Sequence, residues 1–269
     1  MSSTSNQQPH LQTAPPTSSE ELGCRGASLQ YTDGARVTYA LRDITVRLPP
    51  GRFYGIMGPS GSGKSSLLYV LSGLKRPTAG TAYFGDVSYT EKSDAQVTDL
   101  RRRRFGFVFQ QPFLLPYLTA LENIVVAAPK QDREARERAL ARLEALGMAG
   151  LENKLPSQLS GGEKQRVSVV RAMMNDPDVI FADEPTAALD HANGHRVVDA
   201  LAEWRGRGTV VVVTHDPEML EDADEILLLR DGSLAEVRSQ RPLRRDAAAT
   251  PGEDSVFGGK GAVTASPRR

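Results

Sequence analysis

The 269-residue sequence predicts an α/β fold built around a parallel sheet, and three segments carry this prediction. The apolar runs 179–182 and 209–213 are typical of strands that are buried on both faces of a parallel sheet. A third short strand, 52–57, runs directly into a glycine-rich segment that is followed by a helical pattern over 64–71. Strands that alternate with helices in this way favour a parallel sheet with helical connections.

The remaining elements are expected on either side of these segments. A helix is predicted over 132–146, because Asp132 can cap its start, one face is apolar, and Gly147 can end it. Asp231-Gly232 is typical of a hairpin turn. Further strands are expected at 37–48, 105–109, 226–229 and 233–237.

The composition excludes several classes of protein. Lys plus Arg and Asp plus Glu number 33 each, and this zero net charge argues against a general nucleic-acid binder. The longest apolar runs, 67–71 and 124–128, fall far short of the roughly 20 residues that a transmembrane helix needs. The single cysteine, Cys24, excludes a disulfide framework and a cysteine-built zinc site. We therefore expect a cytosolic chain with no nucleic-acid partner.

The two ends differ in composition from the middle of the chain. Fifteen of the first 19 residues are Ser, Thr, Asn, Gln or Pro, which cannot bury enough apolar surface to order the segment. The C-terminal end is rich in Ala, Gly, Pro and Arg without a period. We expect disordered tails at 1–24 and 239–269, and one domain at 25–238.

The segment after strand 52–57 predicts a phosphate-binding loop. It fits the pattern G-x-x-x-x-G-K-[ST], in which glycines let backbone N–H groups point at phosphate oxygens. The following helix adds its positive N-terminal dipole, Lys64 adds a charge at the β and γ phosphates, and Ser65 can ligate Mg²⁺. The expected phosphate contacts are Gly58, Pro59, Ser60, Gly61, Ser62, Gly63, Lys64, Ser65 and Ser66.

The strand 179–182 ends in the two carboxylates Asp183 and Glu184. Taken alone, such a pair is more often a helix cap or a solvated turn. With a phosphate-binding loop upstream, we expect Asp183 to hold Mg²⁺ and Glu184 to polarise the attacking water as a general base.

The segment 159–166, LSGGEKQR, resembles the signature motif of the ATP-binding-cassette (ABC) ATPases. It also fits a plain helix start, with Ser160 as the cap and Glu163 three residues on. The resemblance implies that Ser160, Gly161 and Gly162 contact the γ-phosphate of an ATP held by a second copy of the chain. It further implies a RecA-like phosphate-loop core, an N-terminal antiparallel β subdomain and a helical signature subdomain at about 111–165.

Other positions match landmarks of this family in the expected order. Tyr31 resembles the aromatic residue that stacks on adenine, with Tyr39 as the alternative. Gln110 resembles the glutamine that reaches Mg²⁺ and the attacking water, and Asp190 the acid that lies at the dimer interface. His215 resembles the histidine that contacts the γ-phosphate. The other histidines match no landmark; they are His10, His191 and His195.

The resemblance is strongest to the branch for macrolide efflux, lipoprotein release and antimicrobial-peptide export. It implies an ATPase that binds ATP and Mg²⁺, pairs with a second copy, and drives a separate membrane permease at the cytoplasmic face, favouring export. The alternative is a nucleotide-gated regulator of a membrane partner, of the cell-division type, without cargo. Glu163 stands where glutamine is usual, which leaves every catalytic group in place. The motifs that carry the branch lie at 56–65, 105–110, 118–123 and 182–186.

Overall fold

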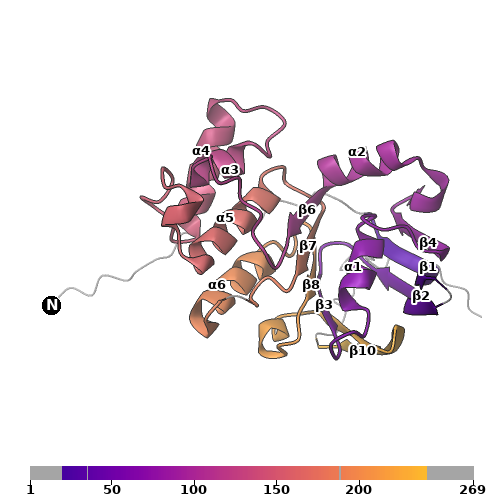
Figure 1. The fold of residues 1–269 in the computed structure, drawn as a ribbon. Coiled ribbons are helices and arrows are strands. Elements are labelled where there is room, and N and C mark those ends of the chain that lie inside the picture. Colours follow the sequence, from indigo (N-terminus) through magenta and orange to yellow (C-terminus); the bar gives the residue numbers. More distant parts are fainter. Residues whose placement is uncertain (1–19, 35, 188, 241–269) are drawn as a thin grey trace, which may run out of the picture.

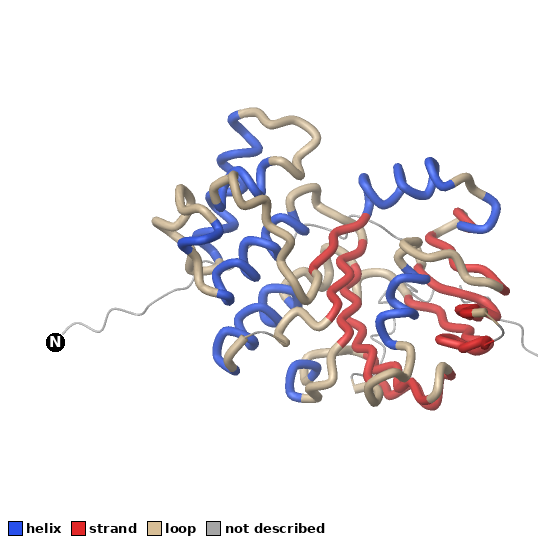
Figure 2. Tube along the Cα trace, in the orientation of Figure 1, coloured by secondary structure: helices blue, strands red, loops and turns tan. Residues whose placement is uncertain are grey.

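The computed structural model describes residues 20–34, 36–187 and 189–240, so most of each tail, expected at 1–24 and 239–269, lies outside this part. Figures 1 and 2 show two sheets and a group of helices at one side. The helices are α1 (Lys64–Leu71), α2 (Asp94–Arg104), α3 (Ala120–Val125), α4 (Arg133–Ala145), α5 (Gly161–Met173) and α6 (His191–Ala202). Short 3₁₀ helices are η1 (Tyr89–Glu91), η2 (Pro156–Gln158) and η3 (Glu218–Leu220).

The larger sheet has the order β10-β9-β3-β8-β7-β6. Its strands run parallel from β6 to β9, and β9 and β10 form an antiparallel hairpin. These strands are β3 (Phe53–Met57), β6 (Phe105–Val108), β7 (Val179–Asp183), β8 (Thr209–Val213), β9 (Glu225–Arg230) and β10 (Ser233–Ser239).

Both faces of the larger sheet are covered. Val211 and Val213 of β8 pack in the core that contains α1, whereas Val210 and Val212 pack against α5 and α6. Alternate side chains of a strand point to opposite faces, so burial on both faces requires an unbroken apolar run. The sequence prediction of a doubly covered parallel sheet is confirmed.

The smaller sheet is antiparallel, in the order β2-β1-β4-β5, and α1 packs between the two sheets. Its strands are β1 (Leu22–Asp33), β2 (Arg36–Leu48), β4 (Ala79–Phe84) and β5 (Val87–Ser88). The tail boundary expected at residue 24 is wrong, because Leu22, Gly23 and Cys24 pair with both β2 and β4. Likewise, β10 extends to Ser239, which pairs with Glu225.

Helices α3, α4 and α5 share a separate core at one side of the molecule, visible at the left of Figure 1. Helix α5 is apolar on two faces: Val167 and Val170 belong to this lobe, and Val169 packs on the larger sheet. Helix α5 therefore joins the helical lobe to the larger sheet. Among the described residues, no helix has both the length and the apolar character needed to cross a bilayer.

Candidate nucleotide site

The phosphate-binding loop leaves the carboxyl end of β3, where ligands of parallel sheets usually bind. Its backbone requires glycine at two positions. Gly58 and Gly63 have φ of 153° and 99°, in the region that residues with side chains avoid. A Cβ at Gly58 would lie 2.2 Å from the Leu229 carbonyl oxygen, and one at Gly63 would lie 2.3 Å from the Ala40 carbonyl oxygen. The neighbouring backbone therefore packs against the loop without room for side chains.

The loop presents groups suited to an anion. Lys64 Nζ donates to the carbonyl oxygens of Gly58 and Pro59 at 2.9 and 3.1 Å, so its ammonium lies over the loop. No side chain caps α1 and its first turn holds no acid, which leaves the first amide groups for a ligand. Ser62 Oγ is buried and has no hydrogen-bond partner among the described residues. These features fit bound phosphate.

Asp183 forms the other wall of this site, at the end of β7. Its Oδ1 accepts a hydrogen bond from Ser65 Oγ at 2.8 Å, and its Oδ2 accepts one from Tyr69 Oη at 2.8 Å. Burial and the contact with Asp183 raise the pKa of Tyr69 to about 12, so this hydroxyl remains a donor at neutral pH. A hydroxyl and a carboxylate are the oxygen ligands that Mg²⁺ prefers.

Tyr69 was missed by the sequence analysis. It follows Ser65 by four residues, and this spacing puts both side chains on the same face of α1. This four-residue spacing could have identified Tyr69 as a residue of the site.

Glu184 and His215 form a second pair beside Asp183. His215 Nδ1 lies 2.9 Å from Glu184 Oε2. The Glu184 backbone has φ of 47°, and its N–H donates to the Val213 carbonyl oxygen at 2.9 Å, which ties it to β8. A left-handed conformation is costly for glutamate and is often found at functional positions.

Helix α5 is hydrogen-bonded to the loop that carries Gln110, both before and after that residue. Gln165 Nε2 donates to the Phe109 carbonyl oxygen at 2.9 Å. Arg171 donates to the carbonyl oxygens of Pro112 and Phe113 at 2.6 and 2.8 Å, and burial lowers its pKa. Gln110 itself is exposed, and among the described residues no hydrogen bond joins its side chain to Ser65 or Asp183.

The signature residues lie at the start of α5, in the other lobe. Ser160 caps the helix: its Oγ accepts from the Glu163 N–H at 3.2 Å, while its own N–H donates to Glu163 Oε2 at 2.7 Å. Ser160 and Gly161 are exposed, and Gly162 is buried. The plain helix-start interpretation of this segment is therefore confirmed, and it leaves two of the three signature residues open to a ligand.

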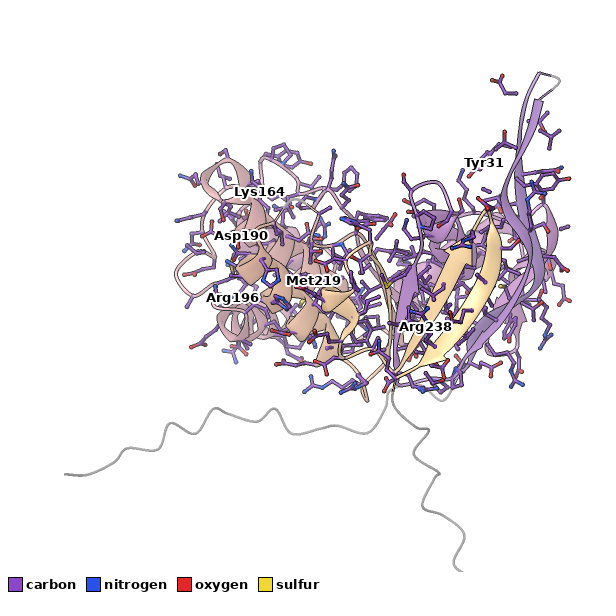
Figure 3. The ribbon with its side chains drawn as sticks, turned by 90° about the horizontal axis from the view of Figure 1, so that it is seen from below. Tyr31, Lys164, Asp190, Arg196, Met219 and Arg238 are labelled. Atoms are coloured by element: carbon purple, nitrogen blue, oxygen red, sulfur yellow. The ribbon has the colours of Figure 1, made fainter. Side chains whose placement is uncertain are left out.

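Asp190 lies at the start of α6, which packs on the larger sheet beside α5. It caps α6 by accepting from the Asn193 N–H at 2.9 Å and from Asn193 Nδ2 at 2.7 Å. Arg166 of α5 donates to Asn193 Oδ1 at 2.8 Å, so Asp190 is linked to the signature helix. Ala188, two residues earlier, lies outside the described residues. Figure 3 shows Asp190 and Lys164 of α5 in one half of the molecule and Tyr31 in the other.

The two candidate adenine-stacking residues lie on neighbouring strands. Tyr31 is 44% exposed, and its hydroxyl accepts from Lys75 Nζ at 2.9 Å. Tyr39 is 43% exposed, with the Arg42 guanidinium 4.4 Å from its ring centroid. Both rings are thus accessible, and stacking by Tyr31 stays a prediction.

Comparison with known proteins identifies the family and the fold. A family model described as ABC transporter matches residues 41–187. The chain belongs to the ABC transporter family. As an ATP-binding cassette of this family, it is an ATPase. The matched range contains the glycine-rich loop 58–65, the segment 159–166 and Asp183-Glu184.

The cassette has well-matched relatives. An uncharacterized ABC transporter ATP-binding protein, MJ0796 from Methanocaldococcus jannaschii, is 42% identical over 80% of this chain and 94% of its own length. The macrolide export ATP-binding/permease protein MacB of Sodalis glossinidius is 41% identical over 81% of this chain. A probable export ATP-binding/permease protein of Pseudomonas fluorescens, Pfl01_2215, is 42% identical over 87%. The chain spans 34% and 36% of these two export proteins.

A solved structure agrees with the fold. The dimeric structure of a post-hydrolysis state of the MJ0796 cassette, bound to ADP and Pi, matches with a TM-score of 0.77 and 36% identity. The match covers 82% of this chain and 99% of that one. It confirms the predicted RecA-like core with its antiparallel and helical parts.

Proposed function

We propose that two copies of this cassette close around two ATP molecules with Mg²⁺, and that hydrolysis drives a membrane permease on a separate chain. The observation that carries this proposal is the division of the site. Ser65, next to Lys64 in the loop, contacts Asp183, whereas the exposed Ser160 lies at the start of α5 in the helical lobe. A second copy can supply the missing half, as the dimeric MJ0796 structures suggest.

Each residue of this site has a proposed role. The loop amides and Lys64 hold the phosphates in place. Ser65, Asp183 and Gln110 would hold Mg²⁺, which when bound supplies positive charge beside the phosphate oxygens. Glu184 accepts the proton of the attacking water, and His215 orients the Glu184 carboxylate through their shared contact.

Helix α5 couples the site to the lobe. It carries the signature residues at its start, and its residues Gln165 and Arg171 donate hydrogen bonds to the loop 109–113. A partner nucleotide that pulls on Ser160 would therefore also move Gln110.

A groove beside this loop is the proposed contact for the permease. It has a volume of about 1000 Å³ and is lined by residues of α2 and β6 on one side and by residues of α5 and of the segment after α3 on the other. Its apolar wall includes Phe109 and the 43% exposed Val126, and its basic wall includes Arg103. A short amphipathic helix of a permease, with acidic residues on one side, fits this lining. The location would then be peripheral, at the cytoplasmic face of the membrane.

Substitution in the groove tests this proposal. Val126→Asp should abolish co-purification of the permease from detergent-solubilised membranes and leave the ATPase activity of the isolated cassette unchanged. Leu140→Asp is the matched control, because Leu140 is 40% exposed on α4 and does not line the groove. Equal recovery of the permease with both variants would contradict the groove assignment.

Export is tested on the reconstituted pair. Vesicles that contain cassette and permease should move cargo outward from the cassette side with ATP, and Glu184→Gln should stop this movement. ATP hydrolysis without movement of any candidate peptide, lipid or macrolide would favour the regulatory alternative.

A further inference from the structure

Two histidines and a glutamate that the sequence analysis set aside converge outside the nucleotide site. His191 and His195 lie one turn apart on α6, and Glu218 is the first residue of η3. His195 Nε2 lies 3.2 Å from His191 Nε2, and His191 Nε2 lies 2.9 Å from Glu218 Oε2. One ligand atom from each residue lies within 4.8 Å of the others.

The backbone holds both arms of this cluster in place. Residues four apart on a helix lie on the same face, so α6 presents both imidazoles together. The next residue after Glu218, Met219, is 4% exposed and packs in the same core as Val197 of α6. Gly194 lies between the two histidines, and the position of a Cβ there is 3.4 Å from Met219 Cε. Met219 therefore packs beside Gly194, which places η3 next to the segment of α6 that carries both histidines.

An ordinary ion pair does not account for the whole cluster. A protonated His191 paired with Glu218 explains the 2.9 Å contact between them. In that ion pair the only proton on His191 Nε2 is donated to Glu218. The contact between His195 Nε2 and His191 Nε2 is then left unexplained. Each of the three residues offers an atom with a lone pair, and these atoms lie together as metal ligands do.

We propose that His191, His195 and Glu218 bind a divalent transition-metal ion, for which Zn²⁺ is the best fit. With ligand distances near 2.05 Å, tetrahedral zinc holds its ligand atoms about 3.3 Å apart. The separations of 3.2 and 2.9 Å from His191 Nε2 are close to this value, and the third pair, His195 and Glu218, lies within 4.8 Å. Two imidazoles and one carboxylate favour Zn²⁺, Ni²⁺ or Cu²⁺ over the oxygen-seeking Mg²⁺. A water molecule would complete the coordination.

The site lies between two segments that the ATPase cycle uses, and this consequence rests on the proposed function. Asp190 directly precedes His191, and His215 comes three residues before Glu218. Figure 3 shows Asp190 and Met219 in the same half of the molecule. An ion that joins α6 to η3 would restrain these two segments against each other. Bound Zn²⁺ should therefore slow ATP turnover.

Metal binding is tested without nucleotide, on protein purified without a histidine tag. Titration with Co²⁺ should give the visible absorption bands of tetrahedral cobalt, saturating at one ion per chain, and Zn²⁺ should displace it. Mg²⁺ should not. His195→Ala and Glu218→Gln should each weaken Co²⁺ binding at least tenfold. Alanine favours a helix, so His195→Ala should keep the far-ultraviolet circular dichroism of the wild type.

The remaining histidines provide the matched controls. His10→Ala and His215→Ala should bind Co²⁺ as the wild type does. Loss of binding in His215→Ala, or unchanged binding in His195→Ala, would overturn the site. Because no nucleotide is present, these outcomes do not depend on the proposed ATPase cycle.

The restraint is tested by ATP turnover with Mg²⁺ in excess. Stoichiometric Zn²⁺ should lower the turnover of the wild type severalfold and leave that of His195→Ala unchanged. Equal inhibition of both proteins would overturn the restraint. An inactive wild type without Zn²⁺ would instead contradict the proposed function.

Discussion

His215 Nδ1 lies 2.9 Å from Glu184 Oε2, which joins the residues that follow two neighbouring strands of the larger sheet. The Glu184 side chain is 18% exposed and that of His215 is 70% exposed, so the carboxylate is largely buried and its histidine partner is not. The Glu184 backbone is also tied to β8 by its contact with Val213. This arrangement fixes the direction of the carboxylate.

Glu184→Gln should lower hydrolysis by about 10²–10⁴-fold, the usual contribution of a general base. The substitution is nearly isosteric and removes a negative charge near the ATP phosphates, which favours the closed dimer. Light scattering should show a monomer without nucleotide and a stable dimer with ATP. ADP should not support this dimer, because the signature residues would lack the γ-phosphate. A variant that remains monomeric with ATP, both alone and with the permease, would contradict this role.

Lys64→Ala should abolish Mg²⁺-dependent hydrolysis. It removes the ammonium that lies over the loop carbonyls of Gly58 and Pro59, and no other side chain of the loop carries a positive charge. Phosphate release and the affinity for a fluorescent ATP analogue measure the loss. Lys130→Ala, at an exposed position after α3, is the control. Wild-type turnover in Lys64→Ala would mean that the loop is misassigned.

Ser160→Arg should stop hydrolysis and leave ATP binding by the dilute monomer almost unchanged. Ser160 is exposed at the start of α5, so an arginine there would occupy the partner's γ-phosphate pocket rather than its own loop. Ser160→Thr, which keeps the helix cap, should retain most activity. A parallel loss of ATP affinity in the monomeric Ser160→Arg protein would count against a shared site.

Glu163→Gln should strengthen ATP-driven dimerisation by roughly two- to fivefold, since it removes a charge that repels the partner's phosphates. Hydrogen bonds with Ser160 lower the pKa of Glu163, so the carboxylate is ionised at neutral pH. Glutamine can still accept from the Ser160 N–H and keeps the cap. Glu163→Ala, which also loses the side-chain hydrogen bond to the Ser160 N–H, separates the two effects. Weaker dimerisation of Glu163→Gln, measured by sedimentation, would refute the repulsion.

Local signals explain which elements the sequence could predict. The helix over 64–71 and the strand over 209–213 were found at the same residues, because glycines and an unbroken apolar run mark them. Strand β1 was missed, since its glycines and polar residues have low strand propensity and it is held by pairing on both sides. Helix α2 has a single buried apolar residue, Val97, and so shows no apolar face.

Local sequence signals also explain which functional residues could be predicted. The phosphate-binding loop and Asp183-Glu184 were predicted because their motifs are contiguous. Helix α3 was missed although Thr119 and Glu122 form a capping box, which was a readable signal. The cluster at His191 was not predictable, because Glu218 reaches it only through the packing of η3 on α6. Residues that meet from distant segments form no motif with a fixed spacing in the sequence.

The buried thiol of Cys24 provides a measure of nucleotide binding in the intact cassette. Cys24 is fully buried in β1, and its Sγ donates to the Ile44 carbonyl oxygen at 3.4 Å. Burial raises its pKa to about 11, so at pH 8 the ratio of thiolate to thiol is about one to a thousand, against about one to three for a free cysteine. Since the thiolate is the reactive form, a thiol reagent should label the native protein very slowly and the denatured protein at once.

Labelling of the native chain then requires opening of the core that Cys24 shares with Leu67 and Leu68 of α1. ATP that binds only the folded state raises the free energy of this opening by about 2.7 kcal/mol at 100 times its dissociation constant. Labelling of the single cysteine should therefore become about 100-fold slower with saturating ATP in the wild type and remain unchanged in Lys64→Ala. The rate is followed by the absorbance of released thionitrobenzoate at pH 8. Rapid labelling of the native wild type would show that Cys24 is not buried, and ATP protection of Lys64→Ala would show that the loop does not bind the nucleotide through Lys64.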